Sequence, residues 1–279
     1  SNNYLIAKLA GGYIELFRNV PILLQILFWY NLFINIFPHP KQSLSFFDLA
    51  FLNQRGLYLP KPIPEEGFLF VGIAFIIGII AAYFIKKFYK KKHELTGIHT
   101  STWPFTLALI IGLPVIIYLL SGTPLQFDYA ILGKFNLKGG MAVVPEFLAL
   151  TFALSVYTAT YIAEAIRSGI EAVDKGQKEA AAAIGLSPVQ SLKLIVLPQA
   201  LRVAIPPTIN QYLNLTKNSS LATVIGYPEL MSTFGGTVLN QVGQAVEILA
   251  MAMLVYLVIS LFISILLNYV NKKMEIQGR

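Results

Sequence analysis

The stretch that decides the fold runs from residue 174 to residue 202 and reads DKGQKEAAAAIGLSPVQSLKLIVLPQALR. It contains two residue pairs with the spacing of a capping box, Asp174 with Gln177 and Ser187 with Gln190. In a capping box the cap side chain and the third helical residue satisfy each other's backbone N–H groups. We therefore expect one short helix to begin after residue 174 and another after residue 187.

The segment between these two helices has the residues of a sharp turn. Gly185 can adopt the left-handed conformation that ends a helix, because it has no Cβ atom to clash. Pro188 suits the first position of the second helix, where its missing N–H costs nothing. Pro198 is expected to close that helix, since proline disfavours helical backbone in the residue before it.

The first of these helices carries a run of small side chains. Residues 180–183 are all alanine. Such side chains would let another protein surface approach the backbone closely, which would make this helix a docking surface. Alternatively, the alanines reflect only their high helix propensity. Composition alone leaves both interpretations open.

The rest of the chain has the composition of a membrane protein, with 56% hydrophobic and only 13% charged residues. Crossing about 30 Å of hydrocarbon as a helix takes roughly 17–25 residues. Six apolar stretches come near or reach that length, and they should be helices because lipid cannot pair exposed backbone groups. They are residues 20–37, 68–85, 105–120, 143–163, 206–226 and 245–267. We therefore predict an all-α polytopic helical bundle.

The distribution of basic residues gives the orientation of these helices. Of the 21 Lys and Arg residues, 15 fall in residues 1–19, 86–104, 164–205 and 268–279. The side richer in Lys and Arg is usually cytoplasmic, so six crossings place both ends of the chain in the cytoplasm. The net charge of +7 then indicates contact with anionic membrane lipid and not with nucleic acid.

Two connecting segments are expected outside the cytoplasm. Residues 38–67 are rich in proline, which favours turns and extended structure, and residues 121–142 are rich in glycine. Either segment could contact a soluble partner, or both could be ordered connectors, which is the interpretation that we favour.

The loop motif resembles that of a known family. The loop contains the three residues EAA, then a glycine after three more residues, and nine residues later an I-x-LP ending. This pattern resembles the EAA loop of binding-protein-dependent ABC importer permeases. The matching residues are Glu179, Ala180, Ala181, Gly185, Ile195, Leu197 and Pro198.

Flanking segments look like the polar amino-acid (histidine and glutamine permease) branch of that superfamily. They are residues 13–18, 161–164, 167–170, 175–177, 197–202 and 217–221. The proline-rich segment, with residues 51–57, is similar to the general L-amino-acid permeases. In that family a further membrane helix precedes the point where this chain begins, so the resemblance suggests N-terminal truncation.

The resemblance implies a permease subunit of the type I ABC importer (MetI-like) fold in the bacterial inner membrane. Its expected partners are a dimer of cytoplasmic ABC ATPase subunits, a sister or identical permease subunit and a periplasmic amino-acid-binding protein. The turn at Gly185 would insert into a groove on the ATPase, and Glu179 would hold the two loop helices in register. The sequence has no phosphate-binding G-x4-G-K-[ST] motif, so a separate subunit would hydrolyse ATP. We expect no catalytic residue, cofactor or metal site in this chain.

This organisation divides the chain into six segments. Residues 1–37 would form an amphipathic N-terminal segment and the first membrane helix, and residues 38–67 an extracytoplasmic insertion. Residues 68–120 would hold two membrane helices with a basic cytoplasmic loop, and residues 121–142 a second outer loop. The permease core would span residues 143–270, with the coupling loop at residues 164–205, and residues 271–279 would be a cytoplasmic tail.

Polar residues near the membrane suggest two further features. Asn210, Asn214 and Lys217 share one helical face, and they either line a substrate pathway or hydrogen-bond to neighbouring helices. We favour the second interpretation. Glu164 and Arg167, three residues apart, are expected to form a surface or gating ion pair.

Two other function classes are alternatives to the importer. An ion-coupled secondary transporter or channel would need acidic residues in mid-membrane or a pore filter, but Glu146 and Glu247 lie near the ends of their predicted spans. An intramembrane enzyme would need paired carboxylates, a metal cluster or an activated nucleophile, and none stands out. The EAA motif favours the importer over both.

Overall fold

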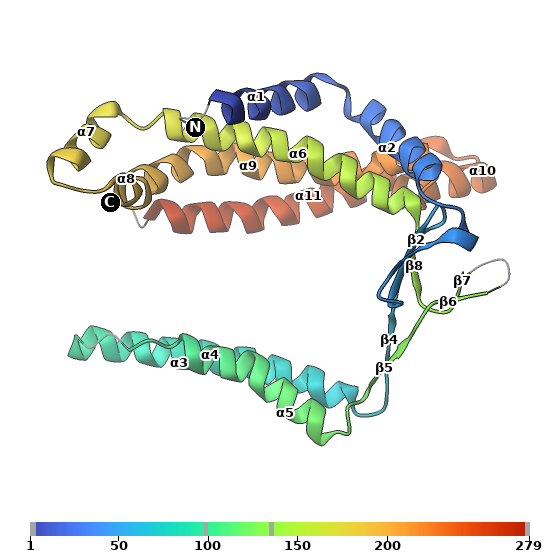
Figure 1. Cartoon of the computed structure of the whole chain (residues 1–279), viewed down its shortest axis with the longest axis horizontal. Helices are drawn as coiled ribbons and strands as arrows, with labels where there is room; N and C mark the ends of the chain where they lie inside the picture. Colours follow the sequence, from blue (N-terminus) through green and yellow to red (C-terminus); the bar gives the residue numbers. More distant parts are fainter. Residues whose placement is uncertain (1–3, 98–99, 134–136, 277–279) are drawn as a thin grey trace. The chain divides into compact units, whose positions relative to one another are not determined.

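The computed structural model describes residues 4–97, 100–133 and 137–276, and it is mostly helical (Figure 1). The described chain divides into two compact units. Unit 1 contains the residues up to His39, the turn Asn53–Gly56 and everything from Val143 onward. Unit 2 contains Pro40–Leu52 and Leu57–Ala142. The segments predicted as separate at residues 38–67, 68–120 and 121–142 thus fall mainly in one unit.

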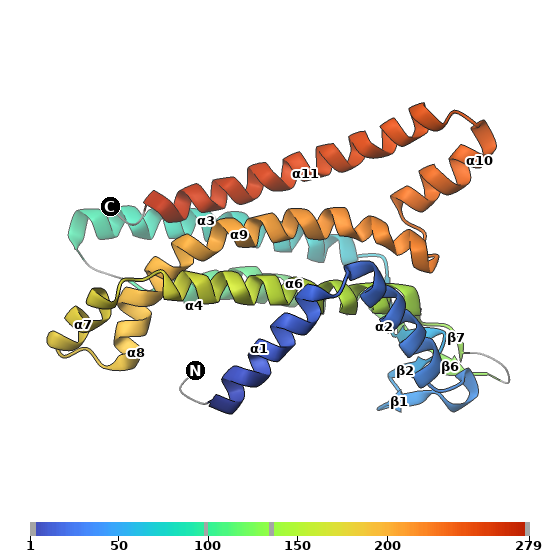
Figure 2. The ribbon, with the colours of Figure 1, turned by 90° about the horizontal axis from the view of Figure 1, so that it is seen from above.

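Unit 1 holds the long helices of the region predicted as the core, residues 143–270, in which α9 packs against both α6 and α11. Figure 2 shows α7 and α8 at one end of these long helices, together with the start of α1 and the end of α11, and α10 at the other end. The helical elements are α1 (Tyr4–Asn19), α2 (Ile22–Ile36), α6 (Pro145–Glu171), α7 (Lys175–Ala183), α8 (Pro188–Ser191), η3 (Leu192–Val196), α9 (Leu197–Asn218), η4 (Ser219–Ile225), η5 (Ser232–Val238), α10 (Leu239–Val242) and α11 (Ala245–Ile276).

Small residues bring α6 and α9 close together. A Cβ atom added at Gly169 of α6 would lie 2.5 Å from the carbonyl oxygen of Ala200 and 3.2 Å from the side chain of Ala204 on α9. Small residues at helix contacts allow this close backbone approach, which drives packing inside membranes. Toward the other end of the unit a buried apolar cluster joins α2, α6 and η4, formed by Ile26, Leu150, Ala153, Leu154, Ala222 and Ile225.

The first predicted membrane helix, residues 20–37, is wrong in extent. Helix α2 has only 15 residues, and α1 precedes it at a bend of 104°. Pro21 begins the second arm, and the buried Gln25 side chain donates hydrogen bonds to the carbonyls of Phe17 (2.8 Å) and Val20 (2.9 Å). The described chain has five helices long and apolar enough to cross a membrane, or six if this bent pair counts as one span.

The prediction that Pro198 ends the second loop helix is also wrong. One helical path runs from Pro188 to Ile225, so the loop helix continues into the fifth span. The N–H group of Leu197 reaches back five residues to the carbonyl of Leu192, which makes residues 192–196 a wide π-helical turn. That turn shifts the hydrogen-bond pattern just before Pro198, whose missing N–H would otherwise break it.

Unit 2 contains a pair of membrane helices. Helix α3 (Phe68–Thr96) packs against the path formed by α4 (Trp103–Leu107), η2 (Ala108–Gly112) and α5 (Leu113–Leu120). A Cβ atom at Gly78 would lie 2.3 Å from the carbonyl oxygen of Leu109, so only glycine permits this contact. The lysine run at residues 86–92 was predicted to lie in a loop. These residues are helical instead, and α3 continues through them to Thr96.

Two other predicted helix ends also move. Helix α6 continues past residue 163 to Glu171, and α11 continues past residue 267 to Ile276. The predicted tail, residues 271–279, is therefore helical as far as it is described. Residues 277–279 lie outside the described residues, as do residues 1–3 at the other end.

The two segments predicted outside the cytoplasm contain short strands. Their elements are η1 (Pro40–Gln42), β1 (Leu44–Phe46), β2 (Ala50–Asn53), β3 (Gly56–Leu59), β4 (Lys61–Pro64), β5 (Leu125–Asp128), β6 (Ile131–Leu132), β7 (Leu137–Lys138) and β8 (Met141–Val143). The sheets have the orders β1-β2-β3-β8, β4-β5 and β6-β7. Strand β4 pairs antiparallel with β5, with Lys61 opposite Asp128. Its two prolines are tolerated because a two-stranded sheet leaves a free edge.

Candidate functional site: the coupling loop and the polar residues of the core

Helix α7 begins at a cap that only partly matches the predicted box. The Asp174 side chain accepts a hydrogen bond from the N–H of Gly176 at 2.6 Å. The backbone N–H of Gln177 donates a hydrogen bond to the backbone carbonyl of Asp174, at 3.1 Å, and not to its side chain. The first helix therefore starts where predicted, with one side-chain cap.

The end of α7 is a tight turn at Gly185, as predicted. Gly185 has a φ of +80°, its N–H bonds to the carbonyl of Ala182, and the N–H of Leu186 bonds to the carbonyl of Ala181. These two bonds define a Schellman motif, which satisfies the last carbonyls of a helix. A Cβ atom at Gly185 would meet nothing within 4 Å, so the backbone conformation alone requires glycine here.

Helix α8 begins with the predicted capping box, and here both halves are present. The Ser187 N–H donates to the Gln190 side chain at 2.9 Å, and the Gln190 N–H donates to the Ser187 hydroxyl at 3.4 Å. Pro188 occupies the first turn. The loop is thus two capped helices with a fixed turn between them.

Apolar packing attaches this loop to the membrane helices. Val173, Val196 and Ala200 form a buried cluster, with Ile170 packed against it. Ala181 of α7 is also buried, with 1% of its surface exposed, and α7 contacts η3. The alanine-rich helix therefore uses one alanine to pack against its own chain.

The other motif residues lie largely at the surface. Ala180, Gly185, Leu197 and Pro198 are exposed, and Ile195 is half-buried. The Glu179 side chain is exposed and makes no hydrogen bond or ion pair within the described part of the chain. Its role in holding the two helices in register therefore stays a prediction.

The turn presents apolar side chains that the motif did not identify. Ile184 is 73% exposed and Val189 60% exposed, on either side of Gly185, and Leu192 and Leu194 follow on η3. Exposed apolar side chains that gather at one turn are suited to contact another protein. Their position between two cap signals could have pointed to them in the sequence. We call Ile184, Gly185 and Val189 the coupling turn.

The predicted pair Glu164 and Arg167 forms a two-pronged ion pair on α6. The guanidinium of Arg167 donates from Nη2 to Oε1 at 2.7 Å and from Nε to Oε2 at 3.1 Å. Sequence spacing could not identify the third member, Arg18 of α1, whose guanidinium lies 3.9 Å from Glu164 and 5.3 Å from the centre of the Tyr161 ring. These groups lie at a groove of about 660 Å³ between α1 and α6.

The three polar residues predicted on one face of the fifth span lie on α9. Asn210, Asn214 and Lys217 are all exposed. Their side chains have no hydrogen-bond or ion-pair partner among residues 4–97, 100–133 and 137–276. Hydrogen bonding to neighbouring helices, the interpretation favoured from the sequence, is therefore not seen within this chain.

The structure adds a carboxylate that sequence reasoning missed. Glu229, between η4 and η5, accepts hydrogen bonds from the Thr223 hydroxyl, the N–H groups of Met231 (2.7 Å) and Ser232 (2.6 Å), and the Tyr256 hydroxyl (2.9 Å). Burial raises the pKa of the Glu229 carboxyl, but these donors outweigh it, so the pKa lies below its usual value. Glu229 thereby attaches the η5 segment to α11.

Comparison with known proteins gives a consistent result. The family described as "Binding-protein-dependent transport system inner membrane component" matches residues 2–276.

Three curated relatives align with the whole chain. It is 50% identical to the "Putative amino-acid ABC transporter permease protein YhdX" of Escherichia coli (strain K12), over 71% of that protein. It is 49% identical to the "General L-amino acid transport system permease protein AapQ" of Rhizobium johnstonii, over 70% of that protein. It is 38% identical to the "Glutamate/glutamine/aspartate/asparagine transport system permease protein BztB" of Rhodobacter capsulatus, over 72% of that protein.

The family match covers nearly the whole chain. It agrees with the several membrane-spanning helices and with the EAA loop, which forms two capped helices around a turn. The chain belongs to the family of binding-protein-dependent transport system inner membrane components, with the MetI-like fold of ABC importer permeases.

Proposed function

We propose that this chain is the permease subunit that carries polar L-amino acids across the bacterial cytoplasmic (inner) membrane, driven by a separate ATPase. The observation that carries the proposal is the coupling turn, an apolar, rigidly capped projection at one end of a bundle of membrane helices. The substrate class is supported by the printed names of three relatives, all of which are amino-acid transport permeases.

The coupling turn would dock into a groove on the cytoplasmic ATPase. Ile184 and Val189 supply apolar contacts, and the glycine turn between them brings the two capped helices close together. Burying one such side chain stabilises a contact by roughly 1.5–3 kcal/mol. A dimer of ATPase subunits would engage two such turns, one on each permease subunit.

The loop would transmit movement because it is continuous with the fifth span. The path from Pro188 to Ile225 is one helix, and the Val173 and Val196 cluster attaches it to the end of α6. Closure of the ATPases would then rock α6 and α9 together, in an alternating-access scheme.

The polar face of α9 would line the translocation pathway. Asn210, Asn214 and Lys217 are exposed on a helix apolar enough to span the membrane. Polar side chains at that depth normally face a bundle interior or a watery cavity, so this face would point toward a sister or identical permease subunit. Lys217 would attract the carboxylate of the amino acid.

Near the end of α6 that leads into the coupling loop, Glu164 and Arg167 would act as a gate together with Arg18. An ion pair at 2.7 Å whose acid also lies 3.9 Å from a second guanidinium can exchange partners when α1 moves. On the outer side, a periplasmic amino-acid-binding protein would deliver the substrate.

The test is uptake of a panel of labelled amino acids into vesicles. The vesicles contain the full-length permease with its candidate ATPase, sister permease and binding protein, with and without internal ATP. Uptake that needs ATP, the ATPase and the binding protein supports the proposal and names the substrates. Uptake that follows an ion gradient when the ATPase is omitted would contradict it and favour a secondary transporter.

A further inference from the structure

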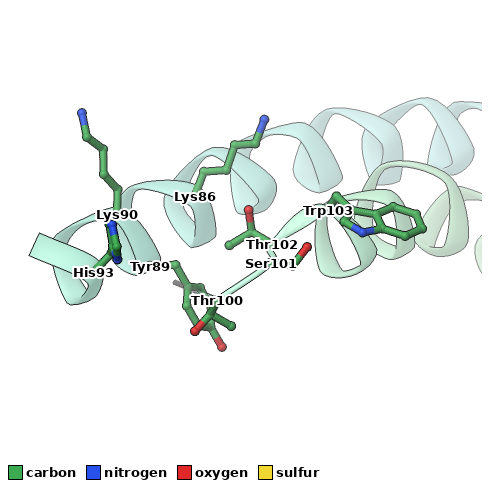
Figure 3. Close-up of a pocket in the computed structure, with 8 residues that line it drawn as sticks. All are labelled: Lys86, Tyr89, Lys90, His93, Thr100, Ser101, Thr102 and Trp103. Carbon is green, nitrogen blue, oxygen red and sulfur yellow. The ribbon is translucent and has the colours of Figure 1, made fainter. Parts of the chain in front are cut away.

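A second connector in the chain has a different chemistry from the coupling loop. It joins α3 to α4 in unit 2, and a pocket of about 350 Å³ lies where the end of α3 meets the start of α4. The residues that line it are Lys86, Tyr89, Lys90, His93, Thr100, Ser101, Thr102 and Trp103. We call this the α3–α4 pocket (Figure 3).

The basic side chains of the pocket come from one face of α3. Lys86, Lys90 and His93 are spaced by four and three residues, which places them along one side of a helix. Figure 3 shows the two lysine side chains extending to the same side of α3. Lys87 and Lys91 have the same spacing on the same helix but do not line the pocket.

The opposite wall of the pocket supplies hydroxyl groups. Thr100, Ser101 and Thr102 come from the segment that leads into α4, and Figure 3 places Ser101 and Thr102 between the lysine-bearing helix and Trp103. Among the described residues that line the pocket, none is acidic. The pocket lining therefore contains two lysine ammonium groups and three hydroxyl groups, with the ammonium ends extended away from the hydroxyls in Figure 3.

Phosphate is the anion that this set of donors suits best. Lysine binds phosphate as a point charge, and hydroxyl groups donate hydrogen bonds to the remaining phosphate oxygens.

The surroundings favour a phosphate that is carried by a lipid. The pocket lies at one end of a pair of membrane helices, at the end that the charge pattern places in the cytoplasm. Trp103 is 65% exposed beside it, and the Tyr89 and Phe105 rings stack 6.4 Å apart between the two helices. Aromatic rings concentrate at the membrane interface, and basic pockets between cytoplasmic helix ends bind anionic head groups.

We propose that the α3–α4 pocket is a phosphate-binding site, filled by the head group of an anionic phospholipid. A free phosphate ion is the other source of the same chemistry. Lys86 and Lys90 supply the charge, the three hydroxyls orient the phosphate, and Trp103 lies beside the lipid.

The experiment uses Trp103 as the reporter. The chain has two tryptophans, so the Trp29→Phe variant leaves Trp103 as the fluorophore, while phenylalanine keeps an aromatic ring against Phe152. The full-length chain is placed in vesicles of phosphatidylcholine that contain brominated phosphatidylglycerol or, separately, brominated phosphatidylcholine. Quenching of Trp103 by the two brominated lipids gives their relative binding constants. We expect phosphatidylglycerol to be preferred by about 5-fold or more, the factor expected for one lysine near an anionic lipid.

A matched pair of variants locates the site. Lys86→Gln with Lys90→Gln should abolish the preference, whereas Lys87→Gln with Lys91→Gln, the same loss of charge on the same helix, should keep it. Equal loss in both double variants would show general surface attraction, and an unchanged preference in both would show that the lysines do not bind; either result overturns the proposal.

A final arm separates the lipid from free phosphate. Inorganic phosphate is added at constant ionic strength, against chloride, to the chain with both lysines in place. A preference for phosphatidylglycerol that persists supports the lipid head group. A preference that disappears with phosphate but not with chloride overturns the assignment to lipid.

Discussion

Two connectors, both at ends of membrane helices that the charge pattern places in the cytoplasm, are built in opposite ways. The coupling loop has a Schellman turn, a complete capping box and exposed apolar side chains. The α3–α4 connector has lysines and hydroxyls, and Thr102, which caps α4, makes no side-chain capping hydrogen bond. The first is rigid and apolar, as a protein partner requires, and the second is basic and polar, as an anionic head group requires.

The largest expected effect comes from the turn glycine of the coupling loop, Gly185, and the turn glycine of the other connector, Gly97, provides its control. Gly185 and Gly97 both end a helix in the left-handed conformation, with φ values of +80° and +71°, and an added Cβ atom meets nothing within 4 Å at either position. Gly185→Val should lower ATP-dependent uptake by at least about tenfold, because forcing an L-residue into this conformation costs roughly 1–2 kcal/mol and reshapes the docking surface. Membrane insertion should be unchanged.

Gly97→Val is the control for that variant. It imposes the same backbone strain at the end of α3, and we expect uptake to stay near the unmodified value. Similar losses of uptake in both variants would mean that the coupling turn has no special role and would break the comparison.

A smaller effect is expected from the exposed apolar side chains. Ile184 in the coupling turn is 73% exposed and Leu95 on α3 is 77% exposed. Ile184→Asp should weaken binding of the ATPase subunit to the detergent-solubilised permease by about tenfold, since a buried apolar contact of roughly 1.5–3 kcal/mol is lost. Leu95→Asp should leave that binding constant unchanged, and equal weakening by both changes would contradict docking at the turn.

The smallest effect concerns the two helix caps. Ser187→Ala removes one half of the capping box, which is worth about 1 kcal/mol. Hydrogen exchange at the Gln190 N–H should then accelerate by about fivefold, because that amide loses its partner. Thr102→Ala should leave exchange in the first turn of α4 unchanged, since the Thr102 side chain makes no capping bond. Unchanged exchange at Gln190 would show that the box does not hold the loop.

Local signals in the sequence predicted the coupling loop well. The turn at Gly185 and the Ser187 box depend on neighbouring residues, so their spacing was sufficient. The effect of Pro198 was predicted wrongly because a π-helical turn, which no spacing rule identifies, allows the helix to continue through it.

Residue spacing could not predict contacts between residues that lie far apart in the sequence. Arg18 reaches Glu164 only because α1 bends back along α6, and Tyr256 reaches Glu229 only because α11 packs beside the preceding turn. The strands were missed for the same reason: β4 and β5 are separated along the chain by a whole pair of membrane helices. Their prolines and short length do not suggest a sheet unless the partner strand is known.

The unbroken path from Pro188 to Ile225 has a mechanical consequence. The longest regular part of that path is α9, whose 22 residues, at 1.5 Å each, make a lever of about 33 Å. A tilt of roughly 5° at the loop end of α9 would displace its far end by about 3 Å, or about half a helical turn. Pro206 and Pro207 lie within α9 and lack N–H groups, so we expect a compliant joint there that would set how much of such a tilt reaches the outer half of the membrane.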